Sequence, residues 1–322
     1  MIEEYRANAL TEFHGLPVFA FSFSDPDELT PGDAPRDVEA WAWRVGAADY
    51  ESPSADKIFP LFLETVGTTR IKALLLGAWE GEMAGEGVDD FQRMLLEAAE
   101  RFPALEALFI SDVSQDLAEI SWIEQKDPAD LLAAFPNLRV LGMRGAPDRQ
   151  LKPFAHAGIE ELVLQSGGLP PEVVRAVGLS DLPALSRLDL YLGTEQYRGG
   201  ATVEDLSPIL SGSAFPNLRH LGLRDAENAD DLAAALAHAP VLAQLESLDL
   251  SLGTLGDVGV AALLAGQPLT HLKRLDVHHH FLSEAMVDRL WQALPETEID
   301  SSERVEPGEW QGEPFRYVAV AE

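Results

Sequence analysis

The sequence predicts an α/β fold built as a solenoid, with parallel strands forming a concave sheet and helices on the outer side. Three observations support this. An apolar strand pattern, L-x-x-L-x-L, recurs along the chain, and four of its copies follow nearly the same proline-containing segment. Between copies, the apolar period changes from two residues to 3.6, which is typical of helices. A solenoid grows by adding units, so 322 residues can form one array.

The strand pattern is clearest after four segments that share a proline. These are Phe102-Pro103-Ala104-Leu105, Phe135-Pro136-Asn137-Leu138, Leu182-Pro183-Ala184-Leu185 and Phe215-Pro216-Asn217-Leu218. Nine copies are found, starting at residues 38, 71, 105, 138, 159, 185, 218, 245 and 272. The first uses Val38, Trp41 and Trp43, and a weak tenth lies near Thr297 and Ile299. Irregular spacing is expected where insertions fall in loops on one face.

Helices are expected between the strands. Asp127 and Pro128 offer a capping carboxylate and a first-turn proline. The Phe-Pro and Leu-Pro pairs end helices, because the residue before proline avoids the α region. Strand, helix and strand at this spacing give parallel strands with right-handed crossovers. The predicted helices begin near Val88, Asp127, Pro170, Val203, Asn228, Asp257 and Ser283.

Each end of such an array needs a cap, because the terminal unit would otherwise expose its apolar core. A capping strand at Leu16–Phe23 and a loop at residues 24–37 make residues 1–37 an N-terminal capping segment. The repeats occupy residues 38–300. A polar loop from Ser301 to Gly312 then leads to a closing strand at Phe315–Val320, so residues 301–322 form the C-terminal cap.

The unit at residues 245–263 is the most regular. Its Leu245, Leu248 and Leu250 are followed by Leu-Gly-Asp-Val-Gly from Leu255 and by Ala-Leu ending at Leu263. It resembles the leucine-rich-repeat family, most closely the ribonuclease-inhibitor-like class, with its L-x-x-L-x-L…L-G-D-x-G-x-x-A-L pattern. The resemblance covers residues 38–300 and implies a horseshoe with a parallel concave sheet. The whole chain is also similar to uncharacterised bacterial leucine-rich-repeat proteins, which implies a bacterial protein but no activity.

The chain departs from the family at one position. Family repeats usually place Asn or Cys eight residues after the first leucine, where the side chain satisfies backbone groups of the turn. The residues found there are Gly46, Trp79, Val113, Ala146, Gly167, Gly193, Ala226, Gly253 and His280. The four glycines predict tight turns that use positive φ.

The charge restricts the partners. The chain has 23 lysines and arginines and 54 aspartates and glutamates, which gives a formal charge of −31. This negative charge disfavours nucleic acid and anionic membranes as partners. The absence of cysteine excludes disulfides, thiolate metal sites and a cysteine nucleophile. Residues 1–10 carry no apolar run for a signal peptide, and no stretch reaches eighteen apolar residues. A cytoplasmic protein is expected.

Side chains alternate across a strand, so the third, fifth and seventh positions of each copy are expected on the concave face. In the early copies these are small or apolar, as at Ala42, Ala73 and Phe109. We expect the N-terminal segment to cover them, since they would otherwise form an exposed patch typical of a contact site. In the later copies they are charged. The predicted partner-binding residues are Arg187, Asp189, Tyr191, His220, Arg224, Asp249, Arg274, Asp276 and His278.

Arginine and tyrosine are enriched in protein interfaces, so the predicted function is a non-enzymatic scaffold that binds another protein and needs no cofactor. The sequence contains no phosphate-binding G-x-x-x-x-G-K-[ST] motif and no G-x-S-x-G nucleophile elbow.

Two alternatives stay open for these residues. Arginines and aspartates of neighbouring strands can pair with one another and bind nothing. Alternatively, His220, Asp249, Asp276 and His278 can form a metal-binding or hydrolytic site. The run His278–His280 provides at most two converging imidazoles, because adjacent residues of a strand point to opposite faces.

Overall fold

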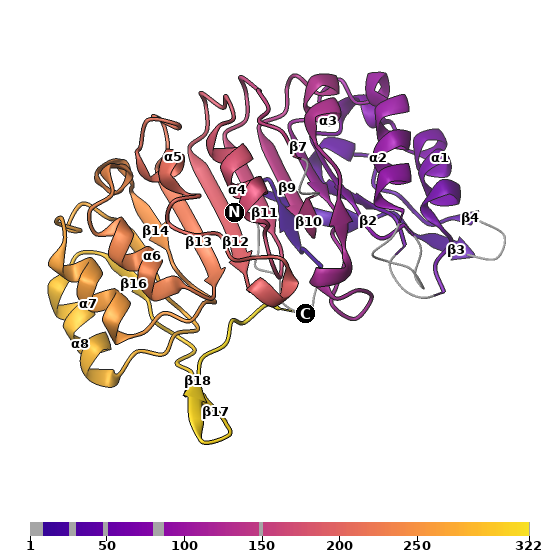
Figure 1. Ribbon diagram of the computed structural model, residues 1–322. Helices are drawn as coiled ribbons and strands as arrows, with labels where there is room; N and C mark the ends of the chain where they lie inside the picture. The colour runs from indigo at the N-terminus through magenta and orange to yellow at the C-terminus, as the bar shows by residue number, and fades with distance from the viewer. Residues whose placement is uncertain (1–8, 26–29, 48–50, 80–86, 148–150, 322) are drawn as a thin grey trace. The chain divides into compact units, whose positions relative to one another are not determined.

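A computed structural model (Figure 1) describes residues 9–25, 30–47, 51–79, 87–147 and 151–321. The chain divides into two compact units. The first comprises residues 1–148 and 155–165, and the second comprises residues 149–154 and 166–322. Both units combine mostly parallel strands with helices, so the predicted α/β class is confirmed.

In the first unit, seven strands are hydrogen-bonded in the order β1-β2-β5-β6-β7-β9-β11. Within this set, β1 is antiparallel to β2 and all other neighbours are parallel. The strands are β1 (Glu12–Phe13), β2 (Leu16–Ala20), β5 (Ala42–Val45), β6 (Ala73–Leu76), β7 (Ala107–Ile110), β9 (Val140–Arg144) and β11 (Glu161–Gln165). Two small pairs lie outside this sheet: β3 (Phe23–Asp25) with β4 (Thr30–Pro31), and β8 (Glu124–Gln125) with β10 (Ala146–Pro147).

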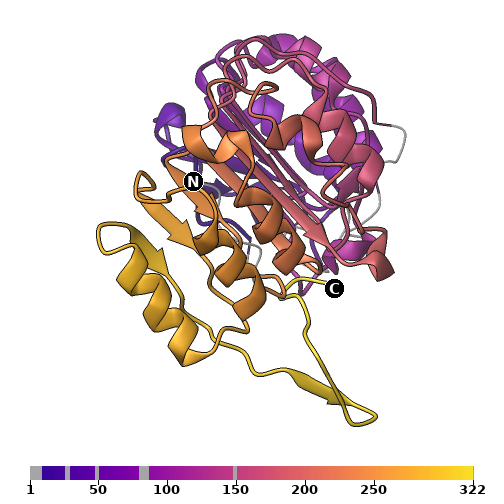
Figure 2. The ribbon, with the colours of Figure 1, turned by 60° about the vertical axis from the view of Figure 1, so that its left-hand side comes forward.

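In the second unit, five strands are parallel to their neighbours in the order β12-β13-β14-β15-β16. They are β12 (Arg187–Gly193), β13 (His220–Ala226), β14 (Ser247–Asp249), β15 (Arg274–Asp276) and β16 (Glu298–Asp300). After β16, the strands β17 (Gly308–Trp310) and β18 (Glu313–Phe315) form an antiparallel hairpin. Figures 1 and 2 show this hairpin projecting from the rest of the unit. The predicted closing strand at Phe315–Val320 is therefore wrong, because residues 316–320 belong to no strand.

The apolar pattern places equivalent side chains opposite one another. One row in the first unit is Trp43, Leu74, Leu108, Leu141 and Leu162, and one in the second is Leu188, Leu221, Leu248, Leu275 and Ile299. All ten are buried, which confirms the predicted strands and includes the weak tenth copy at β16. The first copy is shifted by two residues from its prediction: Trp43 and Val45, and not Trp41 and Trp43, pair with Leu74 and Leu76.

The helices follow the predicted pattern with two exceptions. α5 is a single turn, and α1 was not predicted because it contains Pro60, which lacks an amide donor and disfavours a helix interior. Among the described residues, no helix is long and apolar enough to cross a membrane. The helices are α1 (Ala55–Thr65), α2 (Val88–Glu97), α3 (Ala129–Ala134), α4 (Pro171–Gly178), α5 (Ser207–Leu210), α6 (Ala229–Leu236), α7 (Asp257–Ala265) and α8 (Glu284–Ala293).

Two of the predicted helix starts use a polar side chain as a cap. The Ser283 hydroxyl accepts a hydrogen bond from Met286 N at 3.2 Å at the start of α8. Asp127 accepts one from Ala129 N at 2.9 Å before α3. Later in the chain, α6 packs on α7 and α7 on α8, and Figure 1 shows these three helices side by side.

The N-terminal segment covers the apolar face of the first unit, as predicted. Leu10 and Phe13 form one buried cluster with residues of the repeat strands, and the Phe13 ring meets the Phe109 ring edge to face at 5.9 Å. Leu10 N also donates to Asp112 Oδ1 at 3.1 Å. The strand residues in this cluster are Ala42, Ala73, Leu75, Ala107, Phe109, Val140 and Val163.

The turns after the strands use positive φ, but not always at the predicted glycine. Gly46 and Gly193 have φ of 136° and 65°, as expected. Gly167 and Gly253 do not. In the last three full copies the left-handed residue comes one position earlier, and it is Asp225, Leu252 and His279, with φ of 55°, 66° and 52°.

Side chains at another turn link consecutive copies. Asn137 Nδ2 donates to the Pro103 carbonyl at 3.1 Å, and Asn217 Nδ2 donates to the Pro183 carbonyl at 2.8 Å. Each asparagine belongs to a Phe-Pro-Asn-Leu segment and each carbonyl to the Pro-Ala-Leu segment of the preceding copy. These bonds satisfy backbone acceptors that the missing asparagine ladder would not reach.

Candidate partner-binding surface

The charged face of the second unit is organised as two rows across its five strands. The strand-start row contains the first residue of each strand: Arg187, His220, Ser247, Arg274 and Glu298. The aspartate row lies two residues further along: Asp189, Gly222, Asp249, Asp276 and Asp300. The parallel register places the members of each row opposite one another on adjacent strands.

The strand-start row is partly exposed. The side chains of Arg187 and Arg274 are 19% and 37% exposed, and Glu298 is 71% exposed. Arg274 Nη1 donates to Glu298 Oε1 at 2.8 Å. His220 is largely buried and bridges two strands, since its Nδ1 lies 2.6 Å from Ser247 Oγ.

The aspartate row is largely buried and paired with the strand-start row. Asp189 lies 2.9 Å from both Arg187 Nη2 and His220 Nε2. Burial alone would raise the pKa of Asp189, but the charges of His220 and Arg187 outweigh it and hold the pKa well below its usual range. Asp189 is therefore ionised and locked between two basic groups.

Three aspartates of this row also end their strands. Their Oδ1 atoms accept hydrogen bonds from the backbone two residues on: Asp249 from Ser251 N at 2.9 Å, Asp276 from His278 N at 3.1 Å, and Asp300 from Ser302 N at 3.0 Å. Such side-chain turns compete with sheet pairing, so β14, β15 and β16 have three residues each, whereas β12 and β13 have seven.

Gly222 fills the position in the aspartate row where no side chain fits. A Cβ on Gly222 would lie 2.1 Å from Asp189 Oδ1, so any larger residue would displace that carboxylate. No local pattern indicates this role, because the contact joins residues 33 positions apart.

Arg224 and Tyr191 form a buried pair beyond the aspartate row. The guanidinium lies over the Tyr191 ring at 4.9 Å from its centroid, and its Nε is 3.3 Å from Asp249 Oδ2 and 3.1 Å from Ser251 Oγ. Burial raises the pKa of Asp249, with Asp276 and Asp189 adding to the rise and the charge of Arg224 opposing it. Tyr191 is fully buried and Arg224 is 5% exposed.

Asp276 and His278 form the second charged centre. His278 Nδ1 lies 2.6 Å from Asp276 Oδ1, and Arg274 Nη2 lies 3.0 Å from Asp276 Oδ2. Burial raises the pKa of Asp276, but the hydrogen bonds from His278 and Arg274 lower it to about 2.

The three consecutive histidines do not converge. His279 Nε2 is 3.4 Å from the Tyr317 carbonyl, whereas His280 Nε2 is 3.0 Å from the Ser301 carbonyl and its Nδ1 accepts from Leu282 N at 3.0 Å. Burial lowers the pKa of both His279 and His280. His280 thus satisfies backbone groups of the turn at residues 280–282 and of Ser301.

The structure brings all nine predicted residues into these contacts but corrects their expected exposure. Six of them are buried: Asp189, Tyr191, Arg224, Asp249, Asp276 and His278. Strand alternation identifies the face of a side chain but not what surrounds it, and strands about 4.8 Å apart let long side chains cover their neighbours. Most of these contacts are between residues of neighbouring strands, which is the pairing that the first of the two alternatives in the sequence analysis describes.

Within the part of the chain that the structure describes, two groups have the donor atoms of a metal site. They are Asp189 with His220 and Asp249, and Asp276 with His278 and Asp300, each with ligand atoms within 4.8 Å of one another. However, Arg187, Arg224 and Arg274 already neutralise Asp189, Asp249 and Asp276 at 2.9–3.3 Å. A cation would have to displace these guanidinium groups, so the geometry favours pairing over metal binding.

Sequence reasoning missed the turn role of the aspartates, although a signal was present. Leu248-Asp249-Leu250-Ser251, Leu275-Asp276-Val277-His278 and Ile299-Asp300-Ser301-Ser302 share the pattern apolar-Asp-x-Ser/His. Asp or Asn followed two residues later by a strand break is typical of this turn.

Asp225 was missed as well, and it is fully buried at the end of β13. Its Oδ1 accepts from Val320 N at 2.9 Å, while its Oδ2 has no hydrogen-bond partner among the described residues. Burial raises the pKa of Asp225 well above its usual range, against the hydrogen bond from Val320 and the charge of Arg224.

Asp225→Asn is therefore expected to make the protein more stable than wild type at pH 8, with little difference below pH 4. A carboxyl with a raised pKa favours folding fully below its unfolded pKa of about 3.9, and this contribution disappears as pH rises through the folded pKa. Asparagine keeps the acceptor, cannot ionise and tolerates positive φ. Urea midpoints at pH 4 and pH 8 test this, with exposed Asp231→Asn as the control for net charge. A pH-independent difference between Asp225→Asn and wild type would contradict it.

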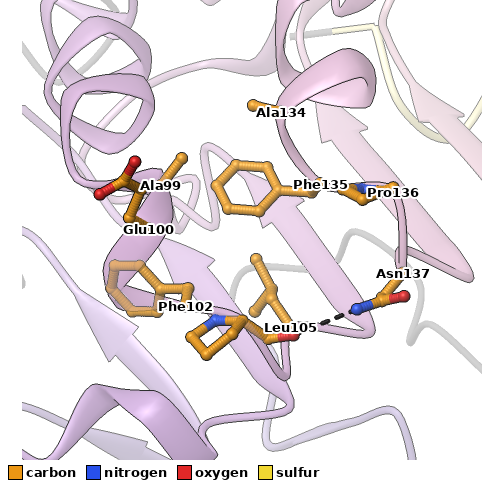
Figure 3. A pocket seen from close by; sticks show the side chains of 9 residues that line it. Ala99, Glu100, Phe102, Leu105, Ala134, Phe135, Pro136 and Asn137 are labelled. Carbon is orange, nitrogen blue, oxygen red and sulfur yellow. Dashed lines mark hydrogen bonds between the residues drawn. The ribbon is translucent and has the colours of Figure 1, made fainter.

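A separate hollow of about 300 Å³ lies in the first unit, between two consecutive copies (Figure 3). Figure 3 shows the hydrogen bond of Asn137 beside it. Glu100 is the one ionisable residue of the lining, so the hollow offers no set of groups for catalysis. The other lining residues are Ala99, Phe102, Pro103, Leu105, Ala134, Phe135, Pro136 and Asn137.

Comparison with solved structures finds a relative that is similar to this chain over most of its length. A protein from Bacteroides fragilis is 32% identical, with a TM-score of 0.75, over 83% of this chain and 76% of its own. A leucine-rich-repeat protein from Leptospira interrogans aligns over 81% of this chain and 90% of its own at 14% identity, with a TM-score of 0.26. No protein-family model and no curated protein matches the chain.

Proposed function

This chain belongs to the same family as the Bacteroides fragilis protein and shares its fold over most of both chains, and from this fold we propose a function for the chain. The chain is a leucine-rich-repeat solenoid of the ribonuclease-inhibitor-like class, and it acts as a non-enzymatic scaffold that binds another protein. The proposed contact surface is the strand-start row of the second unit, and the buried aspartate row supports it from below.

The observation that supports this proposal is the pairing of the charged groups. Asp189, Asp249 and Asp276 each contact an arginine, so none of them is poised as a general base or nucleophile. The strand-start row combines partly exposed arginine and glutamate with a fixed backbone register. Rigid elements that present arginine to solvent are suited to recognising a protein surface.

A charge-neutral double variant tests the surface. Arg274→Gln with Glu298→Gln removes the exposed ion pair of the strand-start row, together with the contact of Arg274 with Asp276, and leaves the net charge unchanged. Quantitative affinity capture from the native host is expected to lose at least one partner by tenfold or more with this variant, because an interface centre commonly depends on few residues. That partner, once purified, should bind wild type in calorimetry and bind the variant measurably more weakly.

The control is an equivalent ion pair in the other unit. Arg93 and Glu97 form an exposed pair on α2, with Nη1 and Oε1 3.1 Å apart. Arg93→Gln with Glu97→Gln repeats the same chemical change away from the proposed surface. If both double variants and wild type captured the same partners in equal amounts, the strand-start row would not be the contact surface.

A further inference from the structure

The last residues of the described chain lie across three consecutive turns of the second unit. Val320 N donates to Asp225 Oδ1 at 2.9 Å, Ala319 N donates to the Leu252 carbonyl at 2.7 Å, and the Tyr317 carbonyl lies 3.4 Å from His279 Nε2. We call residues 316–320 the tail.

The contacted residues are equivalent positions of successive copies. Asp225, Leu252 and His279 are 27 residues apart and all adopt left-handed φ. Because the same turn is repeated, the tail meets an equivalent position of the turn at each step, through the side chains of Asp225 and His279 and the carbonyl of Leu252. The turns therefore form a regular track for an extended chain, as stacked repeats do for the ligands they bind.

The track also fits the side chains of the tail. Arg316 Nη1 donates to Asp230 Oδ2 at 2.8 Å and to the Thr254 carbonyl at 3.0 Å. Its guanidinium occupies space that exists because residue 256 is glycine: a Cβ on Gly256 would lie 2.3 Å from Arg316 Nη1. This is a matched site for a guanidinium group, with a carboxylate, a carbonyl and room for the planar head.

Beyond Arg316, Tyr317 contacts the track, and the three residues after it alternate between burial and exposure. The Tyr317 ring meets the rings of His279 and Phe281 with centroids 6.0 and 5.6 Å apart. Val318 and Val320 are buried, whereas Ala319 between them is exposed. This alternation is how an extended peptide uses every second side chain to recognise a groove.

The segment that leads into the tail is held loosely. Residues 309–315 are all exposed, and the hairpin of β17 and β18 stands away from the unit, with Trp310 70% exposed. Detaching the tail would expose two valines and break no strand of the sheet. Segments with few buried contacts open locally without global unfolding.

We propose that the turn track is a peptide-binding site and that the tail is its occupant in cis. The track is formed by Asp225, Asp230, Leu252, Thr254, His279 and Phe281. The ligand class is an extended peptide with an arginine, then an aromatic residue, then valines at alternating positions, as in Arg-Tyr-Val-Ala-Val. This surface is separate from the strand-start row, so either assignment can fail without the other.

The experiment releases the tail after folding. A protease site is inserted between Gln311 and Gly312, which are exposed and form the hairpin turn with φ of 53° and 85°. The full-length protein is folded, cut, and titrated with a fluorescent peptide of residues 313–322. The cut protein is expected to bind the peptide saturably and at least ~10-fold more tightly than the uncut protein, because the tethered tail competes at high effective concentration.

Two variants distinguish specific from nonspecific binding of the peptide. A peptide with Arg316→Ala is expected to bind the cut protein at least ~10-fold more weakly, because Asp230 Oδ2 and the Thr254 carbonyl lose the guanidinium donor. Gly256→Ala in the protein is expected to weaken binding of the parent peptide but not binding of the Arg316→Ala peptide. Both changes act on the same contact, so the second has no further effect once the first is made. Equal binding by cut and uncut protein, or effects of the two changes that simply add, would overturn the proposal.

A measurement on the uncut protein tests the proposal even if cutting the chain unfolds the protein. Hydrogen exchange at the amides of Ala319 and Val320 is expected to be faster than at the amides of Leu221 and Leu248 in the sheet, because the tail opens alone. If the tail amides exchanged only as slowly as those of the sheet, the tail would be a permanent part of the core and the proposal would fail.

Discussion

Arg224→Ala is expected to lower the free energy of unfolding by about 3–5 kcal/mol, the usual cost of removing one partner of a buried ion pair. Arg224 is 5% exposed, contacts Asp249 and Ser251, and lies over the Tyr191 ring. Alanine would leave the Asp249 carboxylate buried beside Asp276 without its guanidinium. Urea unfolding at neutral pH measures the effect.

A double variant separates the lost charge pair from lost packing. Arg224→Met with Asp249→Asn removes both charges, while the asparagine oxygen still accepts from Ser251 N. Replacing a whole buried pair is often close to neutral, so most of the stability should return. A single Arg224→Ala variant within about 1 kcal/mol of wild type would show that water already solvates this pair, and would contradict the burial of this face.

Leu221→Ala is expected to cost about 2–5 kcal/mol, because Leu221 is fully buried in the aliphatic row between Leu188 and Leu248. In a solenoid, each repeat contacts only its neighbours, so the loss should be local. Hydrogen exchange is expected to quicken in β12, β13 and β14, with β5 and β6 unchanged.

The reciprocal variant completes this test. Leu74→Ala removes the equivalent side chain from the first unit, where it lies between Trp43 and Leu108. It should affect β5, β6 and β7 and leave β13 and β14 unchanged. If either substitution increased exchange throughout both units, the chain would unfold as one cooperative block, and the solenoid proposal would be wrong.

The sequence predicts those features that depend on period and short-range chemistry. The apolar triplets identify ten strands, and the proline segments and caps identify most helices. The contrast between small residues such as Ala73 and charged residues such as Asp249 predicts the cover over the apolar face. The ion pairs of the charged face correspond to an alternative that the sequence left open. Each of these needs only the two-residue alternation of a strand and the 3.6-residue period of a helix.

What the sequence does not reveal depends on distant contacts. Arg224 and Tyr191 are buried because residues of adjacent strands surround them, and Gly222 is required by a carboxylate in another copy. The tail reads as a closing strand because Phe-Arg-Tyr-Val-Ala-Val has a strand-like composition. Its backbone instead bonds to turns about 40 to 95 positions earlier in the chain, which no local pattern encodes.

The cover over the first unit has a consequence for biosynthesis. Leu10 and Phe13 leave the ribosome well before Val163 in β11, the last residue of their cluster. At about 5–20 residues per second, these two residues wait several seconds or more for that strand. During that interval the nascent chain exposes the apolar face of the strands already made, because the cluster cannot be complete before β11 is synthesised.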